Sequence, residues 1–186
     1  MAFYDLSKAE RIKLVEKITR EIRDDLNQVT NENILLYFSD EDTYIRKSGY
    51  LAIGKIYKST ENLQGAIVSA LQKIANSDNE KVRQTVVNAA GEIGMLDFEI
   101  VKGFFDKGLF DDHHSVRNAV IGSVKKMGQK NPKPVLKWAK QYLAHPDKEI
   151  RREICHGIEL RGRTHPQDIL PMLEHLQYDE TARVRN

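Results

Sequence analysis

The chain has 186 residues, of which 40% are hydrophobic, 30% are charged and 8% are aromatic, and its formal net charge is +2. A single cysteine, Cys155, excludes a disulfide framework within the chain, and no apolar run is long enough to span a membrane. The N-terminus has no basic segment followed by an apolar one. We therefore expect a cytoplasmic protein with no membrane partner, built from paired helices with solvated faces.

The first predicted element is a long helix within residues 1–30. Ser7 and Glu10 have the spacing of a capping box, which marks its N-terminus. The apolar residues behind them form one helical stripe: Ile12, Val15, Ile18 (or Thr19), Ile22 and Leu26. This helix lies outside the repeat that follows it, and we expect it to cap one end of the fold.

From residue 31 onward the chain repeats one pattern. An aliphatic residue followed by arginine recurs with a spacing of 34 to 37 residues, at Ile45-Arg46, Val82-Arg83, Val116-Arg117, Ile150-Arg151 and Val184-Arg185. Acids or turn-forming residues precede each pair, and apolar residues follow at the spacing of an amphipathic helix. Gly94, Gly128 and Gly162 each lie eleven residues after an arginine, where we expect a residue with positive φ to end the helix.

Each period predicts two helices separated by a turn. The expected pairs are about 31–39 with 43–57, 61–76 with 80–93, 98–109 with 113–127, and 132–143 with 147–160. The last repeat opens at His165-Pro166, and Pro171 falls inside its first helix, where it should kink that helix. Because the sequence stops one residue after the fifth arginine, we expect this last repeat to be incomplete.

The Val-Arg turn and the small residues six positions after it (Ala52, Ala89, Ser123 and Gly157) resemble the HEAT family of α-solenoids. The resemblance implies an all-α fold, a right-handed α-α superhelix of about ten helices in a single solenoid over residues 1–186. Its parts would be a capping helix at 1–30 and repeats at about 31–58, 60–94, 97–128, 131–162 and 165–186. We interpret the recurring arginines as structural, each bonded to acids of the preceding turn or of the next repeat.

Positive charge concentrates in one part of the sequence. Residues 113–166 contain twelve Lys and Arg against four acids, a net charge of +8, while the remainder carries −6. Such a segment predicts a phosphate-binding surface. The predicted nucleic-acid-binding residues lie on second helices, on the concave side: Lys125, Lys126, Arg152, His156, Arg161 and Arg163. Lys133, Lys137 and Lys140 share one face of a first helix, which we expect on the convex side, where they should contribute less.

A second resemblance lies in the same stretch. The segments that carry it are Asn131-Pro132-Lys133-Pro134-Val135-Leu136-Lys137-Trp138, Ile150-Arg151-Arg152, residues 156–163 and residues 169–174. They are similar to the C-terminal half of bacterial HEAT-like DNA alkylation-repair proteins. That family holds duplex DNA in its concave surface, and some members excise alkylated purines with an acid beside tryptophans.

Two departures weaken the enzymatic implication of this resemblance. His156 stands where relatives often carry an acid, and Trp138 is the only tryptophan. Glu153 and Glu159 are the nearest candidate acids, but a solvated helix face is the commoner explanation for such glutamates. We interpret Trp138 as a core residue rather than as part of a binding cleft.

The sequence therefore favours a non-catalytic binding scaffold with duplex DNA or another nucleic acid as its partner. Two alternatives remain: an alkylpurine DNA glycosylase, and a scaffold that binds a protein partner on its concave face. No catalytic residue, cofactor or metal site is predicted. His113 and His114 lie beside Asp111 and Asp112, but adjacent side chains at a helix start point apart. Cys155 is expected to be a small buried thiol.

Overall fold

The computed structural model describes residues 2–174 and 176–185. These residues form eleven α-helices, short 3-10 helices at Phe3–Asp5, Glu61–Leu63 and Leu176–Tyr178, and no strand. The predicted all-α fold is confirmed. The chain divides into two compact units, residues 1–93 and residues 94–186.

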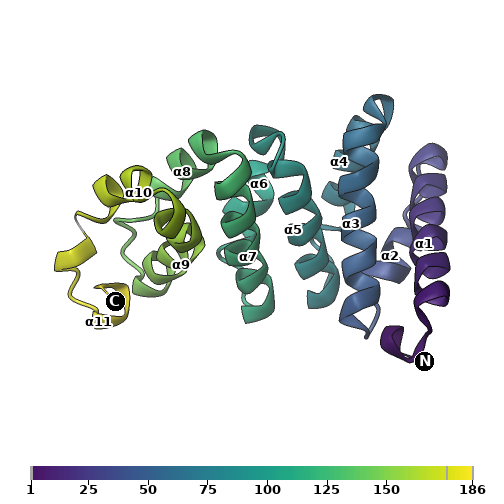
Figure 1. Cartoon of the computed structure of the whole chain (residues 1–186), viewed down its shortest axis with the longest axis horizontal. Helices are drawn as coiled ribbons and strands as arrows, with labels where there is room; N and C mark the ends of the chain where they lie inside the picture. The colour runs from purple at the N-terminus through teal and green to yellow at the C-terminus, as the bar shows by residue number, and fades with distance from the viewer. Residues whose placement is uncertain (1, 175, 186) are drawn as a thin grey trace. The chain divides into compact units, whose positions relative to one another are not determined.

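The N-terminal unit is a bundle of paired helices. Its elements are α1 (Lys8–Gln28), α2 (Glu32–Phe38), α3 (Thr43–Ser59), α4 (Gln64–Ile74) and α5 (Glu80–Gly94). In Figure 1, α1 lies beside α3, and both α2 and α4 pack against these two helices. In the segment predicted as the helix 61–76, the inward-facing apolar residues Leu63, Ile67, Leu71 and Ile74 are all buried.

The long first helix begins as predicted but buries only part of its stripe. Ser7 Oγ accepts a hydrogen bond from the Glu10 amide, and Glu10 accepts one from the Ser7 amide, so the capping box is present. The C-terminal part of the stripe is buried, but Ile12 is 52% exposed and Val15 is 36% exposed, so the prediction is wrong for these two residues. The reason is length: α2 has 7 residues and α1 has 21, so α2 covers only the C-terminal part of α1.

A buried carboxylate fixes the turn between α1 and α2. Asp25 accepts hydrogen bonds from the Thr30 hydroxyl at 3.0 Å, the Asn33 amide group at 2.9 Å and the Ile34 backbone N–H at 2.9 Å. These bonds stabilise Val29 in the left-handed region, with φ of 59°, a conformation that is costly for a β-branched residue.

The C-terminal unit continues the pairing of helices. Its elements are α6 (Phe98–Gly108), α7 (His114–Lys130), α8 (Pro132–Lys140), α9 (Lys148–Thr164), α10 (Pro166–Leu173) and α11 (Ala182–Arg185). α7 lies beside α9, α8 packs against both, and α10 and α11 pack against α9 (Figure 1). Pro171 lies inside α10, which ends at Leu173.

The predicted positive φ of three glycines is wrong, although α5 does end at Gly94. Among the described residues no glycine has a positive φ, and α7 and α9 continue past Gly128 and Gly162 to Lys130 and Thr164. Gly94 instead permits close packing, since a Cβ there would collide with the sulfur of Met127. The small residues six positions after an arginine, in contrast, are all buried: Ala52, Ala89, Ser123 and Gly157.

Candidate functional site

The recurring arginines form one repeated contact with the backbone. In each of the five, Nη1 donates to the carbonyl oxygens six and five residues earlier, at 2.6–3.2 Å. The arginines are Arg46, Arg83, Arg117, Arg151 and Arg185. The partners in the preceding turn are therefore carbonyl groups rather than the acids we expected. This contact satisfies carbonyls that would otherwise lack donors in the turn before each second helix.

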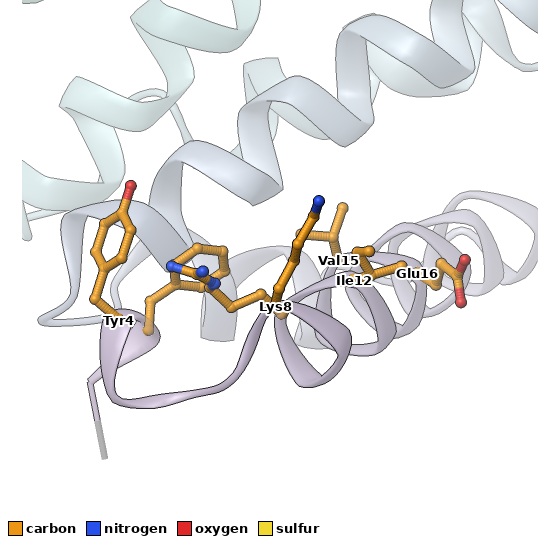
Figure 2. A pocket seen from close by; sticks show the side chains of 7 residues that line it. Tyr4, Lys8, Ile12, Val15 and Glu16 are labelled. Carbon is orange, nitrogen blue, oxygen red and sulfur yellow. The ribbon is translucent and has the colours of Figure 1, made fainter.

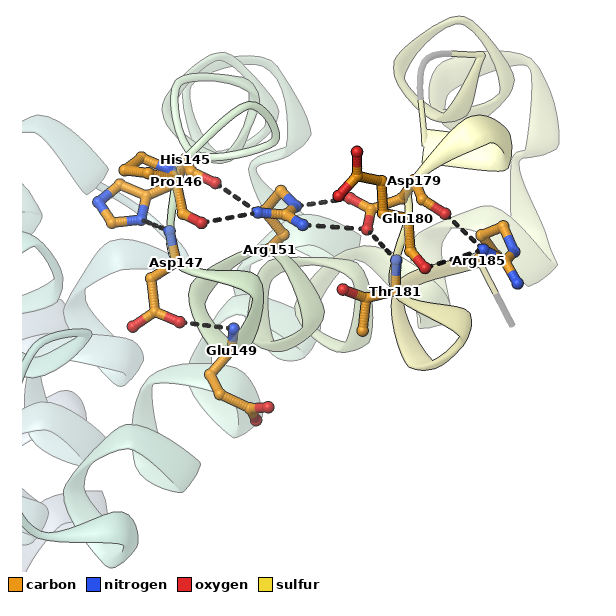
Figure 3. A network of polar contacts seen from close by, with 9 residues as sticks. All are labelled: His145, Pro146, Asp147, Glu149, Arg151, Asp179, Glu180, Thr181 and Arg185. Carbon is orange, nitrogen blue, oxygen red and sulfur yellow. Dashed lines mark hydrogen bonds and ion pairs between the residues drawn. The ribbon is translucent and has the colours of Figure 1, made fainter.

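Two of these arginines also bind an acid of the next repeat, as predicted. Arg151 Nε and Nη2 bind both oxygens of Asp179, at 2.6 and 3.0 Å (Figure 3). This bidentate pair, together with the Thr181 N–H, lowers the pKa of Asp179 to about 2. Arg117 Nε donates to Glu153 at 3.2 Å. These arginines are thus committed to contacts within the C-terminal unit.

Glu153 is not a solvated glutamate. Its side chain is 5% exposed, and its Oε2 is a buried oxygen for which the described residues supply no hydrogen-bond donor. Burial, the largest cause, raises the pKa of this carboxyl group, although Arg117 opposes the shift. The sequence alone did not distinguish Glu153 from Glu159 on the same helix, and we therefore expected both to be solvated.

Carboxylate partners within the chain are present for these predicted nucleic-acid-binding residues: Lys125, Arg152, His156, Arg161 and Arg163. Lys125 Nζ lies 3.5 Å and His156 Nδ1 lies 3.6 Å from the Glu159 carboxylate, which Arg163 also binds. The Arg163 hydrogen bond is the largest cause that lowers the pKa of Glu159. The structure therefore brings three of the predicted residues together, but around an acid.

The other predicted residues lie on the same two helices. Arg152 pairs with Glu149 at 2.9 Å, Arg161 pairs with Asp168 at 2.5 Å, and Lys126 is exposed on α7. We call the six predicted residues of α7 and α9 the α7–α9 basic set. Much of its positive charge is balanced by neighbouring carboxylates.

A second group of cations lies on α8. Lys133, Lys137 and Lys140 are all exposed and share one helix face, and we call them the lysine ridge. In the part of the chain that the structure describes, no carboxylate lies within ion-pair distance of them. They belong to residues 113–146, which contain seven Lys and Arg and no Asp or Glu. That acid-free run is the sequence signal that could have marked the ridge.

Trp138 is a core residue, as predicted. Its side chain is 2% exposed and packs against Phe98 and Phe105, and its Nε1 donates to Asp106 at 2.6 Å. The Tyr142 hydroxyl donates to the same Asp106 oxygen, and burial of the phenol raises the pKa of Tyr142 to about 12. A buried indole of this kind cannot line an open base-binding cleft.

The histidines and the cysteine have ordinary surroundings. His113 is the N-cap of α7, where its Nδ1 accepts from the Ser115 N–H. Among the described residues no group of three or more His, Cys, Asp or Glu is arranged to bind a metal ion. Cys155 is only partly buried, and burial raises the pKa of its thiol to about 11, so the unreactive thiol form predominates at neutral pH.

Two surface hollows are lined largely by apolar side chains. In the N-terminal unit a hollow of about 640 Å³ lies over the uncovered part of α1, where Figure 2 shows Tyr4, Lys8, Ile12, Val15 and Glu16 along its floor and rim. In the C-terminal unit a hollow of about 310 Å³ lies between α9, α10 and α11. Both hollows expose apolar side chains that the sequence pattern would place in a core.

Comparison with known proteins establishes the fold. No protein-family model and no curated protein matches the chain. A chain in a structure of the Pds5–Scc1 complex is similar at 14% identity and a TM-score of 0.56, over 96% of this chain and 29% of that chain. A designed armadillo repeat protein in complex with the peptide (KR)4 has 16% identity and a TM-score of 0.40, over 98% and 92% of the two chains. The likeness to the Pds5-complex chain shows that the fold is a helical-repeat solenoid.

No helix among the described residues combines the length and the hydrophobicity needed to cross a membrane.

Proposed function

We propose that this chain is a non-catalytic binding scaffold whose C-terminal unit binds the phosphate backbone of nucleic acid. The observation that carries the proposal is the lysine ridge on α8, three exposed ammonium groups on one helix face without carboxylate partners among the described residues. Exposed cations that lack partners are the groups that phosphate oxygens neutralise with release of counterions. The resemblance of this region to DNA alkylation-repair proteins makes duplex DNA the first ligand to test.

The lysine ridge should contribute more to this binding than the α7–α9 basic set. A phosphate that approaches Lys125 or Arg152 must compete with Glu159 or Glu149 for the same cation. Such part-exposed pairs are worth only ~0.2–1 kcal/mol each, so they reduce the contribution of these residues without abolishing it. Binding through the basic set stays part of the proposal, as its weaker component.

Two charge-matched variants test this ranking. The ridge variant carries Lys133→Gln, Lys137→Gln and Lys140→Gln. The control variant carries Lys125→Gln, Lys126→Gln and Arg152→Gln. Each loses three positive charges, and each is titrated with a labelled duplex of about 20 base pairs and with the matching single strand between roughly 50 and 300 mM salt. Because each phosphate contact contributes about −0.9 to the slope of log affinity against log salt, the ridge variant should flatten that slope by about 2–3 and the control by less than about 1.

The outcomes separate the parts of the proposal. Equal losses from the two variants would mean that total charge governs binding and that the ridge has no special role. Affinity that is absent, or that does not change with salt, would overturn phosphate binding altogether. Alkylated duplex is included in the titration, and release of the modified base by the wild-type chain would contradict a non-catalytic scaffold.

A further inference from the structure

The hollow between α9, α10 and α11 has an apolar wall and a cationic rim. Its volume of about 310 Å³ is at the lower end of ligand-binding clefts, which measure roughly 300–1,000 Å³. The apolar wall consists of Ile158, Ile169, Leu170, Leu173 and Val184, and Leu170 is 62% exposed. Arg163, Arg185 and Glu159 also line the hollow, so the rim has an excess of positive charge.

Arg185 occupies the same position in its turn as Arg151 does one repeat earlier. Nη1 of Arg185 donates to the carbonyls of Asp179 and Glu180, at 2.6 and 3.2 Å, as Nη1 of Arg151 donates to those of His145 and Pro146 (Figure 3). The two guanidinium groups are therefore anchored in the same way.

The remaining atoms of the two guanidinium groups differ in their partners. Nε and Nη2 of Arg151 hold the Asp179 carboxylate, whereas among the described residues no acceptor binds Nε or Nη2 of Arg185. Because Nη1 already fixes the group, this free edge is a pre-organised fork whose geometry matches a carboxylate. It stands at the rim of the apolar hollow.

We propose that the hollow and the Arg185 fork together bind a segment of a partner protein that carries an Asp or Glu carboxylate beside apolar side chains. The chain contains a template for this contact. The segment 165–181 packs α10 against α9 and places Asp179 on the Arg151 fork. A partner segment of the same character would cover α10 and α11 and pair its carboxylate with Arg185. This surface shares no residue with the lysine ridge and one residue, Arg163, with the α7–α9 basic set.

A synthetic peptide with the sequence of residues 165–182 is the probe, since it supplies both the apolar side chains and the acid. It is labelled and titrated against the full chain, beside a matched peptide with Asp179→Asn. We expect saturable binding of the first peptide and a loss of about 10-fold or more with the second, because bonds to charged groups contribute ~1.5–3 kcal/mol. Arg185→Lys, which keeps the charge but loses the fork, should cost as much, and the two changes together should cost no more than either alone.

Three controls make the test specific. Arg183→Lys changes an exposed neighbour on α11 and should leave peptide binding unchanged. Leu170→Lys should abolish binding by blocking the hollow, while circular dichroism confirms that each variant is folded. The ridge variant should bind the peptide as the wild type does, so failure of nucleic-acid binding and failure of peptide binding can be told apart.

Several results would overturn the proposal. These are absence of saturable binding, equal affinity for the Asp and Asn peptides, or an equal loss from Arg183→Lys and Arg185→Lys. Sedimentation of the chain alone decides a further point. A chain that stays monomeric supports a partner protein, whereas association that Leu170→Lys abolishes would make a second copy the occupant and refute the partner.

Discussion

Replacement of Gly157 by alanine tests how closely α9 packs against α7. A Cβ at this position would lie 2.9 Å from Val124 Cγ1 and 3.2 Å from Val124 Cβ. Val124 Cβ is fixed to its backbone and cannot rotate away, so the two helices must separate by a few tenths of an ångström. Overpacking of this kind costs ~1–3 kcal/mol, and the better helix propensity of alanine offsets ~0.5–1 kcal/mol of it. We expect Gly157→Ala to be net destabilising, by ~0.5–2 kcal/mol.

Gly103→Ala is the matched control. Gly103 lies inside α6, it is exposed, and a Cβ there would meet nothing within 4 Å. The same chemical change should therefore stabilise the chain by ~0.5–1 kcal/mol. Denaturant unfolding measures both variants, and thermal unfolding should show melting temperatures that move in opposite directions by ~1–8 °C. Equal stabilisation by the two alanines would refute the close approach of α7 and α9.

The remaining predictions concern the buried polar groups of the C-terminal unit. The pKa of Glu153 is raised above 4.5 in the folded chain, so protonation of this carboxyl group stabilises the fold below pH 4.5, and this contribution is lost as the pH rises. The free energy of unfolding of the wild type relative to Glu153→Gln, measured with urea, should therefore fall from pH 4 to pH 7. The pKa of Asp179 is shifted in the opposite direction, from 3.8 to about 2, so the ionised carboxylate stabilises the fold above pH 3.8. This contribution to the free energy of unfolding is lost as the pH falls through about 2, and Asp179→Asn should lack this loss in the same assay. Trp138→Phe should cost ~2–4 kcal/mol, because it removes the donor to Asp106 and leaves a void; an unchanged unfolding midpoint would contradict the core position of the indole.

The repeat made the fold predictable. Arginine spacings near 34 residues located the second helices, and the apolar stripes fixed which faces are buried. The error at Ile12 and Val15 had a physical cause that periodicity cannot reveal, since burial of a stripe depends on the length of the neighbouring helix. The glycine error had a similar origin: Gly94 is small because the side chain of Met127 approaches it, and no positive φ is involved.

The candidate site was less predictable, because a count of charges carries no information on pairing. Lys125 and Glu159 are 34 residues apart, so they occupy equivalent positions in successive repeats and meet across α7 and α9. Arg117 meets Glu153, which lies 36 residues later and two residues past Arg151, the equivalent position in the next repeat. A comparison of positions one repeat apart would have found the Lys125–Glu159 pair. The free edge of Arg185 could not be found in this way, since it depends on hydrogen bonds to backbone carbonyls.

Arginines and lysines of the C-terminal unit differ in their contacts, and this difference predicts the kind of nucleic-acid binding to expect. Arg117, Arg151 and Arg161 are bonded to carboxylates of the same unit, and the first two are also bonded to backbone carbonyls. The cations of the lysine ridge, in contrast, are all ammonium groups. Specific recognition of bases relies heavily on the planar fork of arginine, whereas a lysine acts as a flexible point charge toward phosphate. Binding through the ridge should therefore weaken with salt to the same extent for all duplex sequences, and duplexes whose affinities fall by different factors between roughly 50 and 300 mM salt would contradict this reasoning.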